Sequence, residues 1–272
     1  MTIPSLTLND GHSIPQLGFG TWPLQGEEAA SVVSTAIGLG YRHVDTARKY
    51  GNEDGVGEGI RRSGVDRAEL FITTKFDGEF QGGDRAIAGM HGSLELLGTD
   101  YVDLLLIHWP LPARGEFVST WRTFEKLQAE GLVRSIGVSN FRPEHLDVLL
   151  NETHVVPAVN QIQLSPVIQR REQRAYDTEH GIVTESWSPL QGVLDAAVVG
   201  EVAQKHGRTP AQTVLRWHVQ NGLVVIPKSA NAQRLEQNLS IFDFELDAGD
   251  LAKLDTLDAG PDAGVDSNVT GH

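Results

Sequence analysis

The chain of 272 residues contains no cysteine, which excludes a disulfide framework, a thiolate nucleophile and a cysteine metal site. Positive charge is also scarce: 22 Lys and Arg residues stand against 36 Asp and Glu residues, for a net charge of −14. Because binding of a nucleic-acid backbone needs clustered cations, we expect no nucleic-acid partner. No apolar run approaches the roughly 20 residues of a membrane-spanning helix, so we expect no membrane partner. The first residues, MTIPSLTLND, lack a basic region followed by an apolar one, so we expect no secretory signal and a cytoplasmic location.

The chain does contain a regular alternation of short apolar runs and amphipathic segments. The strand-like runs are residues 16–20, 42–45, 70–75, 101–108, 134–139, 158–163, 182–187 and 223–227. Segments with helix signals lie between them, for example 27–39, 117–130 and 143–150. Eight strand–helix pairs predict an α/β fold, a (β/α)8 TIM barrel with right-handed crossovers. A hydrophobic fraction of 40% without a composition break predicts one domain over residues 1–272.

Three segments add to this repeat. Short alternating stretches flank Asn9-Asp10-Gly11, a pattern typical of a β-hairpin, and we expect residues 1–16 to plug the bottom of the barrel. Helical stretches at 196–206 and 210–220 predict an extra helix before the last strand. The short tail over residues 258–272 is rich in Gly and Asp, so we expect it to be loosely ordered.

Four polar side chains stand at or just after predicted strand ends: Asp45, Tyr50, Lys75 and His108. In a (β/α)8 barrel the strand ends and their loops converge on one mouth, so these side chains can form a single site. A carboxylate, a phenol, an ammonium group and an imidazole are the parts needed to protonate a carbonyl oxygen. Each has a structural alternative: a packing tyrosine, a supporting ion pair, or a core histidine beside Trp109. Their joint placement favours a catalytic site.

Three stretches carry a family resemblance. They are GYRHVDTARKYGNEDGVG (residues 40–57), LLGTDYVDLLLIHWP (96–110) and IPKSANAQRLEQN (226–238). In this order and separation they resemble the signature stretches of the aldo-keto reductases, and the match covers essentially the whole chain. The chain looks most similar to the bacterial branch that includes the 2,5-diketo-D-gluconate reductases. The resemblance implies an enzyme, expected to be a monomer, that reduces aldehydes and ketones reversibly to alcohols with NADPH.

The resemblance also implies roles for the four residues. Tyr50 would give its proton to the carbonyl oxygen while NADPH delivers hydride, and His108 would donate a hydrogen bond to the same oxygen. A free phenol has a pKa of about 10, and burial raises it further. A lysine about 4 Å away opposes this by on the order of 4 kcal/mol, or roughly three pKa units before desolvation is subtracted. We therefore expect Lys75 beside Tyr50, with Asp45 holding Lys75 charged and oriented.

The cofactor site has to form without a Gly-rich Rossmann turn. Neither Gly18 with Gly20 nor the glycines at 55, 57 and 59 have the G-x-G-x-x-G spacing, so we interpret them as turn or close-packing glycines. The residues that the resemblance implies for NADPH or NADP+ are Gly20, Thr21, Trp22, Asp45, Ser139, Asn140, Gln161, Trp187, Ser188, Leu190, Gln191, Lys228, Ser229, Arg234, Gln237 and Asn238. Lys228 and Arg234 favour NADPH over NADH. Gln237 replaces a glutamate common in the family, which predicts looser adenine binding.

A second departure from the family lies beside the acid. Arg48 and Lys49 are charged where the family often has small or apolar residues, and Lys49 could favour an anionic carbonyl substrate such as a keto acid. The alternative is a solvated loop or a salt bridge with nearby Glu53 or Asp54. The substrate contacts that we expect are Trp22, Lys49, Tyr50, His108 and Trp109, with Phe76 and Phe80 as further apolar walls.

Two functions of other classes stay open. One is a nucleotide-binding regulatory or sensor protein of the same fold with vestigial turnover. The other is a barrel lyase that forms a Schiff base at Lys75. No metal is expected, because tyrosine and hydride suffice and the ten histidines show no H-E-x-x-H spacing.

Overall fold

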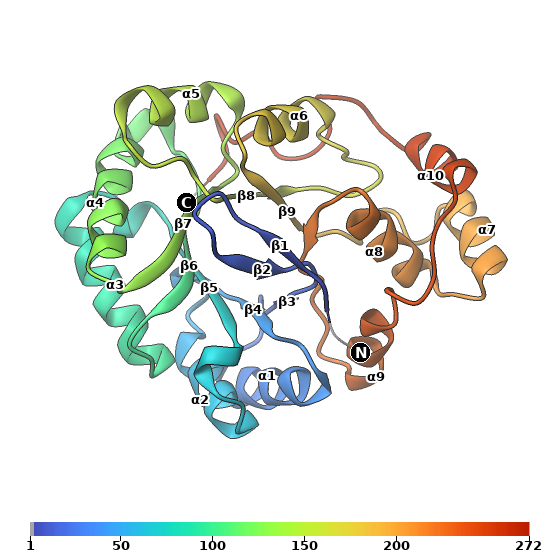
Figure 1. Cartoon of the computed structure of the whole chain (residues 1–272), viewed down its shortest axis with the longest axis horizontal. Coiled ribbons are helices and arrows are strands. Elements are labelled where there is room, and N and C mark those ends of the chain that lie inside the picture. Colours follow the sequence, from blue (N-terminus) through green and yellow to red (C-terminus); the bar gives the residue numbers. More distant parts are fainter. Residues whose placement is uncertain (1–2, 272) are drawn as a thin grey trace.

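Eight parallel strands form the centre of the computed structural model, which describes residues 3–271 (Figure 1). In order around the sheet they are β3 (Phe19–Gly20), β4 (His43–Asp45), β5 (Phe71–Phe76), β6 (Val102–Ile107), β7 (Val133–Ser139), β8 (Val159–Gln163), β9 (Val183–Trp187) and β10 (Val224–Val225). Each strand pairs with its neighbours in the sequence. A parallel bridge between Leu17 and Val225 joins the two edges, so the sheet closes on itself. The predicted (β/α)8 barrel is confirmed.

Helices surround the strands in the ring that Figure 1 shows. They are α1 (Gly26–Leu39), α2 (Glu53–Ser63), α3 (Gly83–Leu97), α4 (Phe117–Ala129), α5 (Pro143–Glu152), α6 (Arg171–Glu179), α7 (Ala197–His206), α8 (Pro210–Gln220), α9 (Ala232–Leu239) and α10 (Ala248–Asp255). Both α7 and α8 lie between β9 and β10, which confirms the extra helix. Pro143 opens α5 at a position where the missing N–H costs no helical hydrogen bond.

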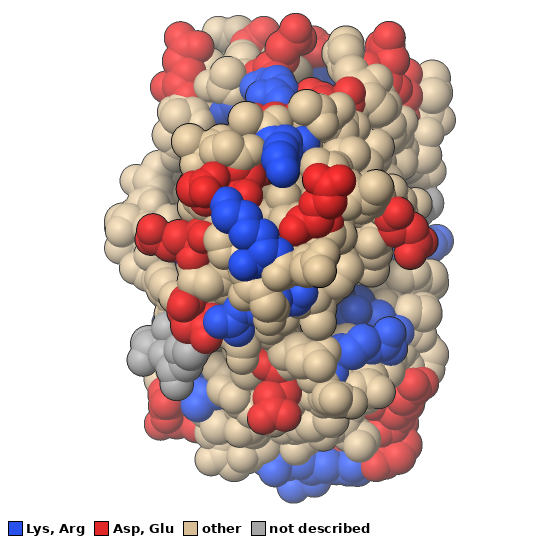
Figure 2. Space-filling view, turned by 90° about the vertical axis from the view of Figure 1, so that its right-hand side faces the viewer, with Lys and Arg blue, Asp and Glu red and all other residues tan. Residues whose placement is uncertain are grey.

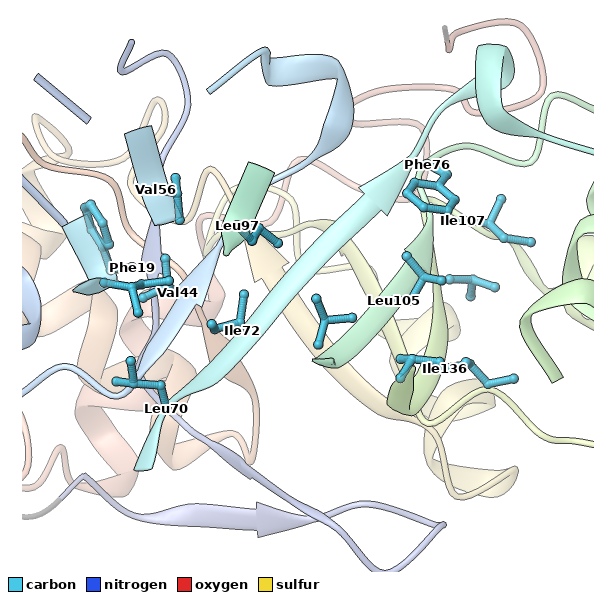
Figure 3. Packing of buried hydrophobic residues seen from close by; sticks show 14 of the residues in the cluster. Phe19, Val44, Val56, Leu70, Ile72, Phe76, Leu97, Leu105, Ile107 and Ile136 are labelled. Carbon is cyan, nitrogen blue, oxygen red and sulfur yellow. The ribbon is translucent and has the colours of Figure 1, made fainter. Parts of the chain in front are cut away.

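Alternation along the strands separates two environments. Val44, Ile72 and Leu105 point outward and are fully buried against the helices, where they meet Val56 of α2 and Leu97 of α3 (Figure 3). Each such side chain contributes on the order of 1.5–3 kcal/mol through burial. The intervening residues point into the barrel, where Asp45 and Lys75 lie towards the carboxyl ends of their strands.

The hairpin fills the inner space at the N-terminal ends of the strands. Strands β1 (Ser5–Thr7) and β2 (Ser13–Pro15) pair antiparallel, and Figure 1 shows them lying across the middle of the strand ring. Leu8 and Ile14 of this segment are buried in one cluster with Phe71, Leu104 and Val159. Water is therefore excluded from the inner space at this end.

Glycines in α2 permit close packing of the helices. A Cβ atom on Gly55 would lie 2.6 Å from the carbonyl oxygen of Gly26, and one on Gly57 would lie 2.6 Å from that of Leu97. Contacts this short do not occur, so larger residues would push α2 away from α1 and α3. The interpretation of these glycines as close-packing residues is confirmed.

The C-terminal tail is more ordered than its composition predicts. The backbone N–H of Ala259 donates to Val167 at 2.9 Å, and that of Val265 donates to the side chain of Gln163 at 2.8 Å. Arg170 donates to the carbonyl oxygen of Val265 at 2.9 Å. The expectation of a loosely ordered tail is wrong, because groups distant in the sequence hold it against the barrel.

Acidic and basic side chains are interspersed on the face that Figure 2 shows, where red and blue groups alternate without a broad patch of one sign. Within residues 3–271, none of the helices is long and apolar enough to cross a membrane.

Candidate active site

Lys75 is the centre of a buried polar cluster. It extends from the inner face of β5 and its side chain is 0% exposed. Its Nζ donates to Asp45 Oδ1 at 2.6 Å, to the carbonyl oxygen of Thr46 at 2.8 Å and to the phenolic oxygen of Tyr50 at 3.4 Å. Asp45 and Lys75 face each other because both occupy inner positions of adjacent strands. The amine and the phenol are thus as close as the sequence argument requires.

Tyr50 ends a short 3-10 turn, Arg48–Tyr50, which follows β4 and is anchored on both sides. The guanidinium of Arg48 contacts Glu53 at 3.1 Å, and Glu53 also accepts hydrogen bonds from other buried groups. The side chain of Gln25 donates to the carbonyl oxygen of Tyr50 at 2.8 Å. The Arg48–Glu53 salt bridge confirms the alternative interpretation of Arg48.

Burial and the nearby charges shift the pKa values of Asp45, Tyr50 and Lys75, and burial raises that of Asp45 against the opposing effect of Lys75. Burial raises the pKa of Tyr50 above its ordinary value, although the Lys75 ammonium opposes the increase. Burial alone would lower the pKa of Lys75, but the carboxylate of Asp45 outweighs it and the pKa is raised. The phenol therefore carries its proton and the amine its charge at neutral pH. Lys75 limits the rise in the Tyr50 pKa without reversing it.

A cavity of about 480 Å³ lies above this cluster. It is lined by Gly20, Thr21, Trp22, Asp45, Lys49, Tyr50, His108, Trp109, Ser139, Asn140, Gln161, Trp187, Ser188, Ile226 and Lys228. The rings of Tyr50 and His108 meet edge to face with centroids 5.8 Å apart, and the ring of Trp22 lies 5.3 Å from that of Tyr50. Three of the four predicted catalytic residues line one cavity, and Lys75 contacts two of them from below.

Four of the implied cofactor residues form a hydrogen-bonded row along the wall of this cavity. Trp187 donates from its indole to Asn140 at 2.9 Å, and Asn140 donates to Ser139 at 3.0 Å. Ser139 donates to the backbone carbonyl of Gln161 at 2.8 Å. Asn140 has φ 63° and Ser188 has φ 51°, so both hold the left-handed conformation, which asparagine tolerates but which is costly for serine. The backbone here is held in place to present these side chains.

The remaining implied cofactor residues do not line the cavity. They are Leu190, Gln191, Ser229, Arg234, Gln237 and Asn238. Gln191 accepts a hydrogen bond from Gln163 at 3.4 Å. Lys228 is exposed and lines the cavity. Arg234 follows it in the sequence and is exposed in the first turn of α9. These residues extend from the cavity along the ends of β9 and β10.

Phe76 and Phe80, which we expected as walls of the substrate pocket, do not line the cavity. Phe76 is fully buried on the outer face of β5, where Figure 3 shows it near Ile107 and its ring packs against Phe80 and Phe124. Because the side chains of a strand alternate, the neighbour of inward-facing Lys75 points away from the cavity. Phe76 and Phe80 therefore belong to the core between strands and helices.

Lys49 lies at the rim of the cavity. Its side chain is 49% exposed, and its Nζ is 3.7 Å from Asp77 Oδ2, beyond hydrogen-bond distance. The partner is thus Asp77, and neither Glu53 nor Asp54 pairs with Lys49 among the described contacts. The amine remains accessible from the cavity.

Sequence reasoning missed two residues of this region. Ile226 lines the cavity, and Glu185 lies fully buried beneath it on β9. Glu185 stands two residues before Trp187, so strand alternation already places both on the inner face.

Comparison with known proteins gives consistent matches over the whole chain. The model of the Aldo/keto reductase family matches residues 16–259. An aldo-keto reductase from Mycobacterium sp. (strain KMS) is 49% identical over 100% of both chains. Methylglyoxal reductase DkgA from Escherichia coli (strain K12) is 44% identical over 98% of both. The crystal structure of a Gox0644 mutant in complex with NADPH superimposes with a TM-score of 0.96, 46% identity and 100% coverage of both chains.

Proposed function

The chain belongs to the aldo/keto reductase family, and we propose that it is an NADPH-dependent enzyme that reduces aldehydes and ketones reversibly to alcohols. The observation that carries this proposal is the fully buried amine of Lys75, held 2.6 Å from Asp45 and 3.4 Å from the phenolic oxygen of Tyr50. A fixed cation beside a phenol that faces a cavity is suited to proton transfer to a carbonyl oxygen. We further propose that one domain carries the whole site, since its lining residues come from the strand ends and loops of a single barrel.

The four residues then divide the reaction among them. Tyr50 transfers its phenolic proton to the carbonyl oxygen as negative charge develops there, and Lys75 stabilises the phenolate that remains. Asp45 keeps Lys75 ionised and oriented. His108 lines the cavity beside the phenol and donates a hydrogen bond to the same oxygen. Fixed hydrogen bonds and charges aimed at developing negative charge are often the largest contribution to catalysis.

The donors along the cavity fit a nicotinamide nucleotide, which supplies hydride when bound. Ser139, Asn140 and Gln161 present hydroxyl and amide groups suited to a carboxamide, and Trp187 presents an aromatic ring beside them. Lys228 and Arg234 are exposed cations in a chain of net charge −14, and they would hold the 2′-phosphate of NADPH. Gln237 offers no charge, so adenine binding is looser.

The substrate class follows from the cavity and the relatives. Relatives named methylglyoxal reductases indicate small carbonyl compounds, which we propose for this chain as well. The accessible amine of Lys49 at the rim would attract a carboxylate on such a compound, which favours keto acids over their neutral analogues.

The structure argues against a Schiff base at Lys75. Its amine is 0% exposed, has a raised pKa and makes hydrogen bonds to Asp45 and Thr46, whereas a nucleophilic amine must be neutral and open to substrate. Borohydride trapping with a carbonyl compound is expected to leave Lys75 unmodified.

The direct test is NADPH absorbance with a panel of carbonyls that includes methylglyoxal and a keto acid with its methyl ester. We expect stoichiometric NADPH oxidation and kcat/KM at least tenfold higher with NADPH than with NADH. Equal use of NADH would refute the assignment of Lys228 and Arg234. Nucleotide binding without turnover of any carbonyl would instead favour a sensor role.

A further inference from the structure

The barrel interior contains a second buried carboxyl group below the Lys75 cluster. Glu185 of β9 is 0% exposed and does not line the cavity. The side-chain amide of Gln161 donates to Asp45 Oδ2 at 2.8 Å and to Glu185 Oε2 at 2.9 Å. One amide group therefore connects Glu185 to the carboxylate that holds Lys75.

The groups that face Glu185 come from several elements. His43 of β4 lies 3.6 Å away and also contacts Thr73 at 3.1 Å. Burial lowers the pKa of His43 to about 3, so it is neutral. Asp45, Lys75 and Tyr50 are the other titratable groups whose charge interacts with Glu185. From the flanking strands, β8 contributes the neutral Gln161 and β10 the apolar Val224, which is the register partner of Glu185.

The charges in this space balance only if one carboxyl group is neutral. Lys75 carries one positive charge, and Asp45, in direct contact with it at 2.6 Å, supplies the matching negative charge. An ionised Glu185 would be a second negative charge without its own cation, in a region where burial of an unpaired charge is costly.

Building on the proposed reductase function, we propose that Glu185 is a positioning residue for the proton transfer. Through Gln161 it fixes the second oxygen of Asp45 and thereby the orientation of Lys75. By staying neutral, it leaves the charge of Lys75 balanced by Asp45 alone, which keeps the phenol of Tyr50 acidic enough to donate its proton. Glu185 touches neither substrate nor cavity, so its action passes through other residues.

The energetics support this assignment. Burial and the charge of Asp45 raise the pKa of Glu185 to about 8, against the opposing effects of Gln161 and Lys75. Above that pH the added negative charge disfavours the phenolate of Tyr50 and weakens the acid. Removing the charge should therefore lower the pH at which Tyr50 loses its proton.

Two variants separate the charge of Glu185 from its hydrogen bond. Glu185→Gln keeps an acceptor for Gln161 but cannot ionise, and Glu185→Met keeps the volume but has neither property. In alcohol oxidation the phenolate accepts a proton, so activity rises as Tyr50 ionises. We expect this rise to move to lower pH by about one unit in both variants. At neutral pH, kcat should fall several-fold in Glu185→Met and stay within about twofold in Glu185→Gln.

A second readout does not depend on turnover. A carboxyl group whose pKa is raised on folding binds its proton more tightly in the native state, so stability falls as pH rises from about 4.5 to about 8. In Glu185→Gln the melting temperature should therefore decrease less between these two pH values than it does in the unsubstituted protein. Asp177→Asn is the matched control, because Asp177 is also buried with a raised pKa of about 6, but it contacts Asn160, Gln173 and Thr184 on the outer face of the sheet.

These outcomes distinguish the hypotheses. If the melting temperature of Glu185→Gln falls with pH as steeply as that of the unsubstituted protein, the claim that Glu185 is a buried neutral carboxyl group is overturned. If Glu185→Gln flattens the decrease in melting temperature but leaves the pH profile of alcohol oxidation unchanged, the positioning role is overturned. An equal shift of that pH profile in Asp177→Asn would overturn it as well. If the unsubstituted protein shows no turnover, both the reductase function and the positioning role fail. The pH dependence of the melting temperature still shows at which pH Glu185 ionises.

Discussion

Two cavities of similar volume open among the loops at the carboxyl ends of the strands, and their cations have different partners. The cavity above Lys75 measures about 480 Å³, and the one beneath the C-terminal tail, here called the tail cavity, measures about 430 Å³. Asn140 lines both. In the tail cavity Arg142 contacts Asp266 at 3.1 Å and Arg171 contacts Asp258 at 3.0 Å. There the arginines bind the chain's own tail.

Whether a cation can take part in a reaction depends on the groups that it contacts, and the volume of the neighbouring cavity does not indicate it. In the tail cavity each of these ion pairs is exposed to solvent, and such pairs contribute about 0–1 kcal/mol. Lys75 is buried, and besides Asp45 it contacts a phenol that faces the neighbouring cavity. Its field therefore acts on a group that can react. Substitutions in the two regions should differ by orders of magnitude in their effect on turnover.

Tyr50→Phe should have the largest effect on turnover. It removes only the phenolic oxygen, and loss of a general acid lowers kcat by about a thousandfold. NADPH affinity, measured by fluorescence quenching, and the melting temperature should change little, because the ring and its contacts with Trp22 and His108 remain. Retention of more than a tenth of the activity would exclude Tyr50 as the acid.

Lys75→Met should follow, with losses in both activity and stability. It leaves Asp45 as a buried carboxylate without its cation, which costs about 3–5 kcal/mol in the free energy of unfolding. Turnover should fall about a hundredfold, since the pKa of Tyr50 rises further once the ammonium is gone. The control is Asp45→Asn in combination with Lys75→Met. It should restore much of the stability, measured by urea unfolding, but not the activity; recovery of both would show that Lys75 acts only as a structural partner.

Lys49→Met tests the rim of the same cavity and should have a smaller, selective effect. Because Lys49 is half exposed, its attraction for a substrate carboxylate is at most about 1 kcal/mol, or about fivefold in kcat/KM. The loss should appear with a keto acid and be absent with its methyl ester. Arg48→Met is a poor control, since Arg48 anchors the turn through Glu53, so Lys49→Arg is the better one. An equal loss with acid and ester would remove Lys49 from substrate selection.

Much of this arrangement could be predicted from the sequence, and the failures have identifiable causes. Alternating apolar runs located the strands, and the strand ends placed Asp45 and Lys75 together. Phe76 follows Lys75 directly in the sequence, but strand alternation turns it to the outer face and away from the cavity. The same alternation points Glu185 inward, although no motif of the sequence marks it. The tail could not be predicted, because its order depends on Gln163 and Arg170, about a hundred residues earlier in the chain.

Arg142→Ala should have the smallest effect on turnover and is the sharpest test of the comparison. Its guanidinium contacts Asp266 in the tail at 3.1 Å, and the α5 cap remains because the backbone N–H of Arg142 still donates to His145. Loss of an exposed ion pair of this kind costs about 1 kcal/mol or less, so kcat/KM should change less than twofold. Limited proteolysis should cleave the tail over residues 258–271 faster, with Asp266→Asn as the partner variant that produces the same change. A tenfold loss of kcat/KM with small carbonyls in either variant would mean that the tail cavity takes part in the reaction, and the contrast between the two cavities would fail.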